Sequence, residues 1–306
     1  MSENLFASFS PRKKFFVGID SDGCVFDSME IKWKECFIPQ AIKHWGLQSV
    51  SKYAREAIEF VNLYSQDRGI NRWPGIVNAV DWLSRWPAPM ERKPALPPFA
   101  RMRRWLKETS IHSNATLTAL IEREPEDEEL RRWLAWSKAV NAAIADMVIG
   151  VPPFPAAPAT LQKMLDWADI VVVSGTPAEA LEREWEEAGL RPCVRMICGQ
   201  ELGTKVAHLA GCAGGGRYEP DHVLMIGDAP GDQKAAVKSG ALFYPIIPGE
   251  EEECWRRLRD EALGLFFNGK YAGDYAKQLS DRFNARLPSE PHWVAAGCAG
   301  CAGCKA

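Results

Sequence analysis

The stretch FFVGIDSDG, residues 15–23, decides the fold. Five apolar or small residues, 15–19, run directly into the acidic pair Asp20 and Asp22. A short run without polar residues is typical of a strand that is buried on both faces of a parallel sheet. Ligands bind at the carboxyl ends of such strands, so both carboxylates stand where a functional site is expected.

The C-terminal half of the chain alternates between strand and helix patterns. Apolar runs predict strands at 170–173, 194–197, 223–226 and 241–247. Helical patterns lie between them, at 177–188, 203–210 and 231–239. This alternation predicts βαβ units, and therefore a parallel sheet with helices on both faces. Right-handed crossovers make it a doubly wound α/β fold.

Residues 29–152 have helical periodicity and almost no strand pattern. The clearest helices are expected at 51–64 and 127–148, and proline-rich breaks at 87–98 and 152–158 divide or bound the region. A single strand cannot form a domain, so residues 15–19 must join the later strands. The helical region is therefore an insertion in an α/β core.

These boundaries divide the chain into three parts. We expect a discontinuous core of residues 1–28 and 153–290, with residues 1–14 as a loose leader. An inserted helical domain spans residues 29–152, and a disordered tail spans 291–306. The tail carries Cys298, Cys301 and Cys304, whose spacing also occurs in metal sites, so zinc bound between subunits stays open.

Polar residues follow two of the later strands as well. Ser174 and Gly175 follow the strand at 170–173. Asp228 follows the strand at 223–226, and Asp232 comes four residues later. Together with Asp20 and Asp22, four carboxylates gather at one sheet edge, where they repel one another unless a cation lies among them. Oxygen ligands without clustered histidines or cysteines favour magnesium over zinc.

The same set of residues suits phosphoryl transfer. Ser174 can donate a hydrogen bond to a phosphoryl oxygen, and Lys205 can offset its charge. A carboxylate is a competent nucleophile toward phosphorus and forms an aspartyl-phosphate. A second carboxyl close by can protonate the leaving oxygen and then activate water.

The order of these motifs resembles the haloacid dehalogenase (HAD) superfamily. Asp-x-Asp-Gly at 20–23 is followed by strand-Ser-Gly-Thr, by Lys205 and by Gly-Asp-x-x-x-Asp at 227–232. The match covers roughly residues 15–28 and 160–247. The resemblance implies that Asp20 is the nucleophile and Asp22 the general acid/base. It implies that Ser174 and Gly175 bind the phosphoryl group and that Lys205 orients Asp20.

The resemblance also implies a magnesium site and a cap. Asp228 would bind the ion with Asp20 and the backbone carbonyl of Asp22, and Asp232 would be a further ligand or a support. Residues 29–152 then look like the helical cap of the subgroup with an insert after the first motif. Such a cap would close over the core to exclude water and supply specificity.

Asp22 separates two activities of this superfamily. An alcohol leaving group benefits from an acid beside the nucleophile, whereas a halide does not, so we expect a phosphatase-type hydrolase rather than a dehalogenase. The substrate would be a small phosphorylated metabolite. A phosphomutase acting on a sugar phosphate stays open, as does a non-catalytic binding or scaffold protein that retains the fold.

Composition limits the partners. The formal net charge of −3 gives no reason to expect nucleic acid, and no apolar run is long enough to span a membrane. Nine cysteines, an odd count, do not suggest a disulfide framework, so we expect a cytoplasmic protein. Self-association into a homo-oligomer stays open.

Two clusters in the inserted region invite alternative interpretations. Eight of the twelve tryptophans lie there, and we expect most to pack the interior rather than line a substrate pocket. Arg101, Arg103, Arg104 and Lys107 form a basic cluster. We favour a solvated helix face over recognition of a second anionic group on the substrate.

Overall fold

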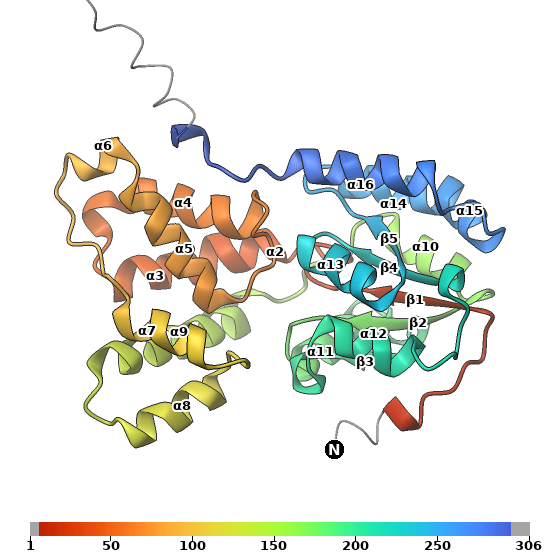
Figure 1. The fold of residues 1–306 in the computed structure, drawn as a ribbon, viewed down its shortest axis with the longest axis horizontal. Helices are drawn as coiled ribbons and strands as arrows, with labels where there is room; N and C mark the ends of the chain where they lie inside the picture. Colours follow the sequence, from red (N-terminus) through yellow and green to blue (C-terminus); the bar gives the residue numbers. More distant parts are fainter. Residues whose placement is uncertain (1–5, 295–306) are drawn as a thin grey trace, which may run out of the picture. The chain divides into compact units, whose positions relative to one another are not determined.

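The computed structural model describes residues 6–294 and divides them into two compact units (Figure 1). We call residues 6–29 and 150–287 the core unit, and residues 30–149 and 288–294 the helical unit. The three cysteines of the tail lie outside the described residues. No described helix is long and apolar enough to cross a membrane.

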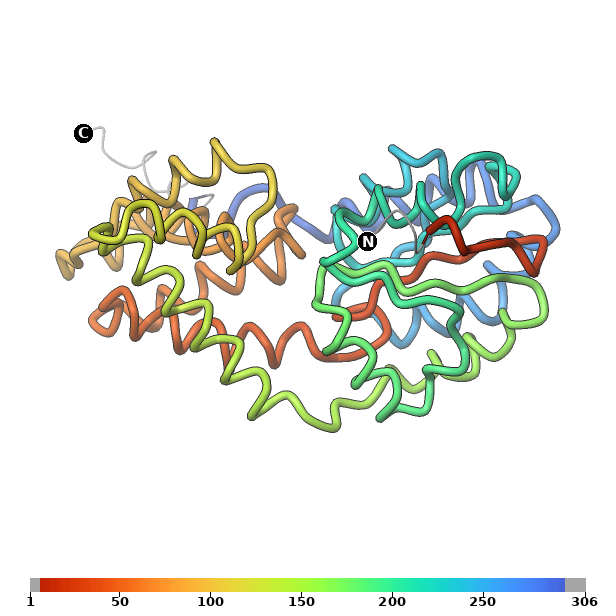
Figure 2. The backbone as a smooth tube through the Cα atoms, turned by 90° about the horizontal axis from the view of Figure 1, so that it is seen from below, coloured from red at the N-terminus to blue at the C-terminus, as the bar shows by residue number. Residues whose placement is uncertain are grey.

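The core unit is built on one parallel sheet of five strands in the order β3-β2-β1-β4-β5. The strands are β1 (Phe15–Ile19), β2 (Ala168–Val173), β3 (Met196–Cys198), β4 (Val223–Gly227) and β5 (Leu242–Pro245). Figure 2 shows helical segments on both sides of this sheet. The doubly wound parallel sheet expected from the sequence is therefore confirmed.

Strand β1 lies in the middle of the sheet, paired with β2 on one side and β4 on the other. All five of its residues are buried, which explains why the run at 15–19 contains no polar side chain. From β1 the chain adds β2 and β3 on one side of the sheet, and then β4 and β5 on the other side. The direction of winding thus reverses at β1, so a crevice is expected at its carboxyl end.

The helices of the core unit follow the expected alternation. They are α10 (Ala157–Met164), α11 (Ala178–Glu187), α12 (Lys205–Ala213), α13 (Pro230–Ser239), α14 (Glu251–Arg257), α15 (Leu263–Phe267) and α16 (Asp274–Arg286). Helix α10 and the last three helices were not predicted from periodicity. Trp255 on α14 is buried and donates a hydrogen bond of 2.8 Å to the carbonyl of Cys24. These helices therefore belong to the packing of the core.

Residues 6–14 differ from the loose leader that we expected. The backbone N–H of Arg12 donates to Asp169 at 2.8 Å, and the backbone N–H of Lys13 does so at 3.0 Å. Asp169 is 1% exposed and also accepts from Arg195 and Tyr218. A buried carboxylate requires such partners, and here they anchor the N-terminal segment to β2.

The helical unit is an all-helical assembly. Its elements are α2 (Met29–Ile31), whose first residue the division assigns to the core unit, η1 (Lys32–Phe37), α3 (Ile38–His44), η2 (Gln48–Val50), α4 (Ser51–Leu63), α5 (Arg72–Ser84), α6 (Pro87–Met90), α7 (Ala100–Glu108), α8 (Asn114–Arg123) and α9 (Glu128–Met147). Helix α9 begins after Asp127, whose side chain accepts a hydrogen bond from the Leu130 N–H.

Tryptophans fill the interior of the helical unit. Within residues 30–149 the six buried ones are Trp33, Trp45, Trp73, Trp105, Trp133 and Trp136. Trp45 packs against Trp133 and Trp136, with ring centroids 4.4 and 5.1 Å apart. Core packing is thus confirmed for most of the eight tryptophans.

The helical unit extends further along the chain than the sequence indicated. Trp293 is 5% exposed, and its ring stacks on Trp86 at 4.2 Å with an interplanar angle of 6°. Residues 291–294, which we had assigned to a disordered tail, therefore include a packed aromatic side chain.

Candidate active site

Asp20 is the first residue after β1 and stands at the carboxyl edge of the sheet. Its backbone N–H donates to the carbonyl of Ile226 on β4, so the strand pairing continues to this residue. Its Oδ1 accepts a hydrogen bond of 2.8 Å from the Ser21 N–H. With 6% exposure, the carboxylate is almost removed from bulk water.

Lys205, the first residue of α12, joins two of the carboxylates. Its Nζ lies 2.5 Å from Asp20 Oδ2 and 2.6 Å from Asp232 Oδ1. Burial alone would lower the pKa of Lys205, but the charges of Asp20 and Asp232 more than offset this, so its pKa is raised. The lysine therefore stays cationic and holds both carboxylates in place.

Asp20, Asp228 and Asp232 form an acidic cluster, with one carboxylate oxygen from each within 4.8 Å of the others. All three side chains are buried. Burial raises the pKa of Asp232. The negative charges of Asp20 and Asp228 also raise this pKa, whereas the positive charge of Lys205 lowers it. Lys205 contacts two of these three carboxylates, and a cluster of oxygen-only ligands fits a hard divalent cation such as magnesium.

Asp232 has a second contact that sets its position. It lies in the first turn of α13, and its Oδ2 accepts a hydrogen bond of 3.1 Å from the Ala229 N–H. This contact satisfies a backbone N–H at the start of the helix. Oδ1 and Oδ2 thus serve different partners, so Asp232 both caps the helix and pairs with Lys205.

The Asp22 side chain is held away from the acidic cluster by two hydroxyl groups. Ser28 Oγ donates to its Oδ1, and Thr176 Oγ1 donates to its Oδ2 at 2.8 Å. The carboxylate group of Asp22 is not part of the cluster, so only its backbone carbonyl remains a candidate ligand. Thr176 belongs to the strand-Ser-Gly-Thr motif, but the sequence predicted no role for it. The structure shows that its hydroxyl group fixes the Asp22 side chain.

Ser174 follows β2 directly and is 2% exposed. Its backbone N–H donates to the carbonyl of Cys198 on β3, and its Oγ accepts from the Thr176 N–H at 3.2 Å. Gly175 is exposed, and a Cβ built on it would meet no atom within 4 Å. Ser174 thus lies at the end of the strand beside β1, and Gly175 borders open space.

Two buried tryptophans support the loop after β1. Trp185 on α11 donates a hydrogen bond of 3.0 Å to Ser21 Oγ, and Trp255 on α14 bonds the carbonyl of Cys24. Cys24 is fully buried, and burial together with the charges of the acidic cluster raises the pKa of its thiol. The loop is therefore rigidly packed, and Cys24 is an unreactive packing residue.

The structure brings Asp20, Lys205, Asp228 and Asp232 into one cluster. Asp22 and Ser174 are connected to each other through Thr176, on the neighbouring strand end. The sequence did not predict that Trp185 bonds Ser21 or that Ser28 bonds Asp22. In the sequence, Trp185 looks like an ordinary packing residue and Ser28 like an ordinary capping residue.

No protein-family model and no curated protein matches this chain. Solved structures do resemble it. Two are phosphoglycolate phosphatases by predicted assignment. One, from Lactobacillus delbrueckii subsp. bulgaricus, is 16% identical with a TM-score of 0.46, covering 89% of this chain and 99% of its own. The other, from Haemophilus somnus, is 15% identical with a TM-score of 0.43, covering 79% and 93%.

A third structure is the L-2-haloacid dehalogenase from Xanthobacter autotrophicus. It is 15% identical, with a TM-score of 0.39, and the match covers 83% of this chain and 86% of its own.

Proposed function

We propose that this protein is a magnesium-dependent hydrolase of the HAD superfamily that cleaves a phosphate monoester of a small metabolite. The observation that carries the proposal is Lys205, which contacts Asp20 and Asp232 while Asp228 completes the acidic cluster. A buried nucleophile, a fixed cation and a set of oxygen ligands are what phosphoryl transfer to a carboxylate requires.

In this proposal Asp20 attacks phosphorus and becomes the aspartyl-phosphate. The Ser21 N–H holds its Oδ1, and Lys205 holds its Oδ2, so the carboxylate cannot rotate freely. Magnesium, held by Asp20, Asp228 and Asp232, would offset the charge of the phosphoryl oxygens. Ser174 would donate a hydrogen bond to one of these oxygens, because its hydroxyl stands at the adjacent strand end.

Asp22 is suited to act on the proton of the leaving group. The hydroxyls of Ser28 and Thr176 fix its orientation. The carboxyl can therefore protonate the leaving oxygen and afterwards accept a proton from water that attacks the aspartyl-phosphate. This role also favours an alcohol leaving group, and hence a phosphatase rather than a dehalogenase.

The test is hydrolysis of 4-nitrophenyl phosphate with magnesium by wild type, Asp20→Asn and Asp27→Asn. Asp27 is exposed in the same loop and serves as a matched control. We expect loss of at least ~10³-fold in Asp20→Asn, since the nucleophile is removed, and near wild-type rates in Asp27→Asn. Release of phosphate from sugar phosphates supports hydrolysis, whereas isomerisation without release identifies a mutase. An inactive wild type across a broad phosphate panel would favour a scaffold.

A further inference from the structure

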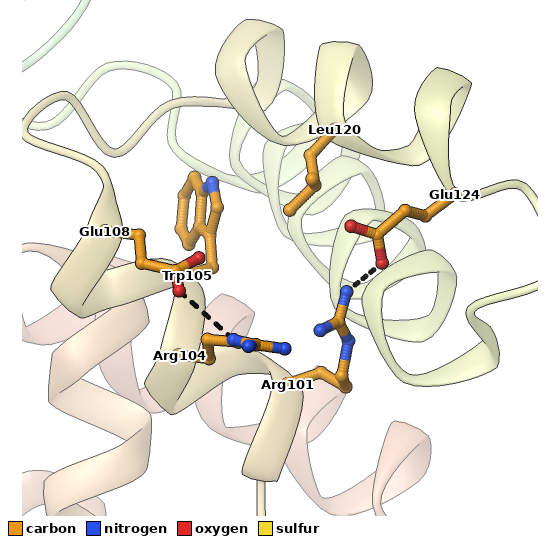
Figure 3. Close-up of a pocket in the computed structure, with 6 residues that line it drawn as sticks. All are labelled: Arg101, Arg104, Trp105, Glu108, Leu120 and Glu124. Atoms are coloured by element: carbon orange, nitrogen blue, oxygen red, sulfur yellow. Dashed lines mark hydrogen bonds and ion pairs between the residues drawn. The ribbon is translucent and has the colours of Figure 1, made fainter.

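The arginines of α7 are neutralised within the helical unit. Arg101 pairs with Glu124 and Asp127, Arg103 pairs with Asp81 at 2.6 Å, and Arg104 pairs with Glu108 at 3.1 Å. Figure 3 shows the recess between α7 and α8, where Arg101 and Arg104 each point to a glutamate. The positive charges of these three arginines are therefore paired with carboxylates of the helical unit.

Arg72, at the start of α5, has a different environment. Its Nη1 donates to Ser137 Oγ at 3.2 Å and to Asn141 Oδ1 at 2.6 Å, both on α9. Its guanidinium lies over the ring of Phe37, 4.9 Å from the centroid. All three partners are neutral, and no carboxylate of the described residues contacts Arg72. Burial lowers the pKa of Arg72 to about 10, so the group remains cationic at neutral pH.

The contacts of Arg72 leave one edge of its guanidinium available. Both bonds use Nη1, while Nε and Nη2 donate to no acceptor in the part of the chain that the structure describes. Neither nitrogen is sealed from solvent. The Nε–Nη2 edge is the side of a guanidinium that binds two oxygens of a carboxylate or phosphate in parallel.

The neutral partners also fix the orientation of this edge. Ser137 is fully buried and interrupts the apolar stripe of α9, whereas Asn141, one turn later, is exposed. Phe37 is 6% exposed and stacks on Trp33 at 4.2 Å, so its ring is itself immobilised. The guanidinium is thus held in one plane before any ligand arrives, which lowers the entropy cost of binding.

We propose that Arg72 binds a carboxylate or phosphate group of a ligand through its Nε–Nη2 edge, making the helical unit an anion-recognition domain. A partly desolvated cation without a counter-charge is costly, and a bound anion supplies the missing partner. This binding belongs to the helical unit alone and is independent of the function proposed above.

The binding test follows the melting temperature of the full chain with succinate and, separately, with methylphosphonate. We expect either anion to raise the melting temperature of wild type but not that of Arg72→Gln, which lacks the cationic pair of donors.

Two further variants sharpen this test. Arg72→Lys keeps the charge but loses the parallel pair of bonds, so it should retain only part of the shift in melting temperature. Arg104→Gln removes an exposed arginine that already has a carboxylate partner, and its shift should equal that of wild type. An equal shift in wild type and Arg72→Gln would overturn the inference, as would a wild type without any shift.

Discussion

Lys205 Nζ lies 2.5 Å from Oδ2 of Asp20, although 185 positions separate the two residues in sequence. The same nitrogen contacts Asp232 at 2.6 Å, so a single ammonium group connects the ends of β1, α12 and α13. A cation in this position both stabilises two buried carboxylates and fixes the proposed nucleophile.

Replacing Lys205 by Met should affect stability and activity together. The change leaves Asp20 and Asp232 without their common cation, and we expect a loss of about 3 kcal/mol of unfolding free energy. Activity should fall at least ~10²-fold, because the phosphoryl charge is no longer offset. Urea unfolding and steady-state kinetics measure the two effects. Lys234→Met, on the exposed side of α13, is the control, and equal behaviour of both variants would contradict this role.

Magnesium should raise the melting temperature of the protein. An ion bound among Asp20, Asp228 and Asp232 relieves their mutual repulsion, and saturation at about 100 times Kd contributes about 2.7 kcal/mol. Asp228→Asn should abolish most of this shift, and chelation with EDTA should reverse it in wild type. Asp221→Asn, at an exposed carboxylate, should keep the full shift. A shift that survives in Asp228→Asn would place the ion elsewhere.

Gly227→Ala should disturb the acidic cluster without altering any charge. A Cβ at Gly227 would lie 2.4 Å from the Asp232 side chain, whose Oδ2 is fixed by the Ala229 N–H. We expect a loss of about 1–3 kcal/mol of stability and a clear loss of activity, because Asp232 must move. Gly231→Ala meets no atom within 4 Å and should be neutral or slightly stabilising. Thermal unfolding and kinetics of both variants check this contrast.

His208 should make stability fall in mild acid. The side chain is fully buried, and burial, together with the nearby charge of Lys205, lowers its pKa from 6.5 to about 4. Between these values the unfolded chain binds more protons than the folded one. Stability is therefore complete above pH 6.5 and is lost as the pH falls toward 4, by at most about 3 kcal/mol.

Substitution of His208 tests this pH dependence. In His208→Phe the decline of unfolding free energy between pH 6.5 and 4 should become shallower, whatever the variant's stability at pH 7. His292→Gln, at a largely exposed histidine, should leave the slope unchanged. Chemical denaturation at several pH values provides the slopes, and identical slopes in His208→Phe and wild type would refute the assignment.

Strand β1 and the alternation after residue 158 were predictable because they are local patterns. The run at 15–19 contains no polar residue, and each later strand is a short apolar run followed by a helical pattern. Strand ends were less certain. Strand β2 starts at Ala168, before the apolar run, because Asp169 is paired with Phe16 and satisfied by Tyr218 and Arg195. A charged residue inside a strand is not recognisable without its partners.

The candidate site was predictable in its composition but not in its connections. Residues that follow parallel strands meet at one edge of the sheet, so Asp20 and Asp228 could be expected to approach each other. The hydrogen bond from Thr176 to Asp22, and the sharing of Lys205 between two carboxylates, depend on side-chain directions across different strands. Nor did the sequence distinguish Arg72 from the other arginines of the inserted region.

By itself, the sequence determined the α/β class, the helical insertion and the identity of the residues at the strand ends, because periodicity and polar breaks are encoded within a few residues. Only the tertiary structure decided which charges are paired. Lys205 meets two carboxylates, and the arginines of α7 meet glutamates and aspartates, whereas Arg72 meets neutral groups. Pairing depends on the distance between side chains far apart in the chain, and that distance exists only after the helices and strands have packed.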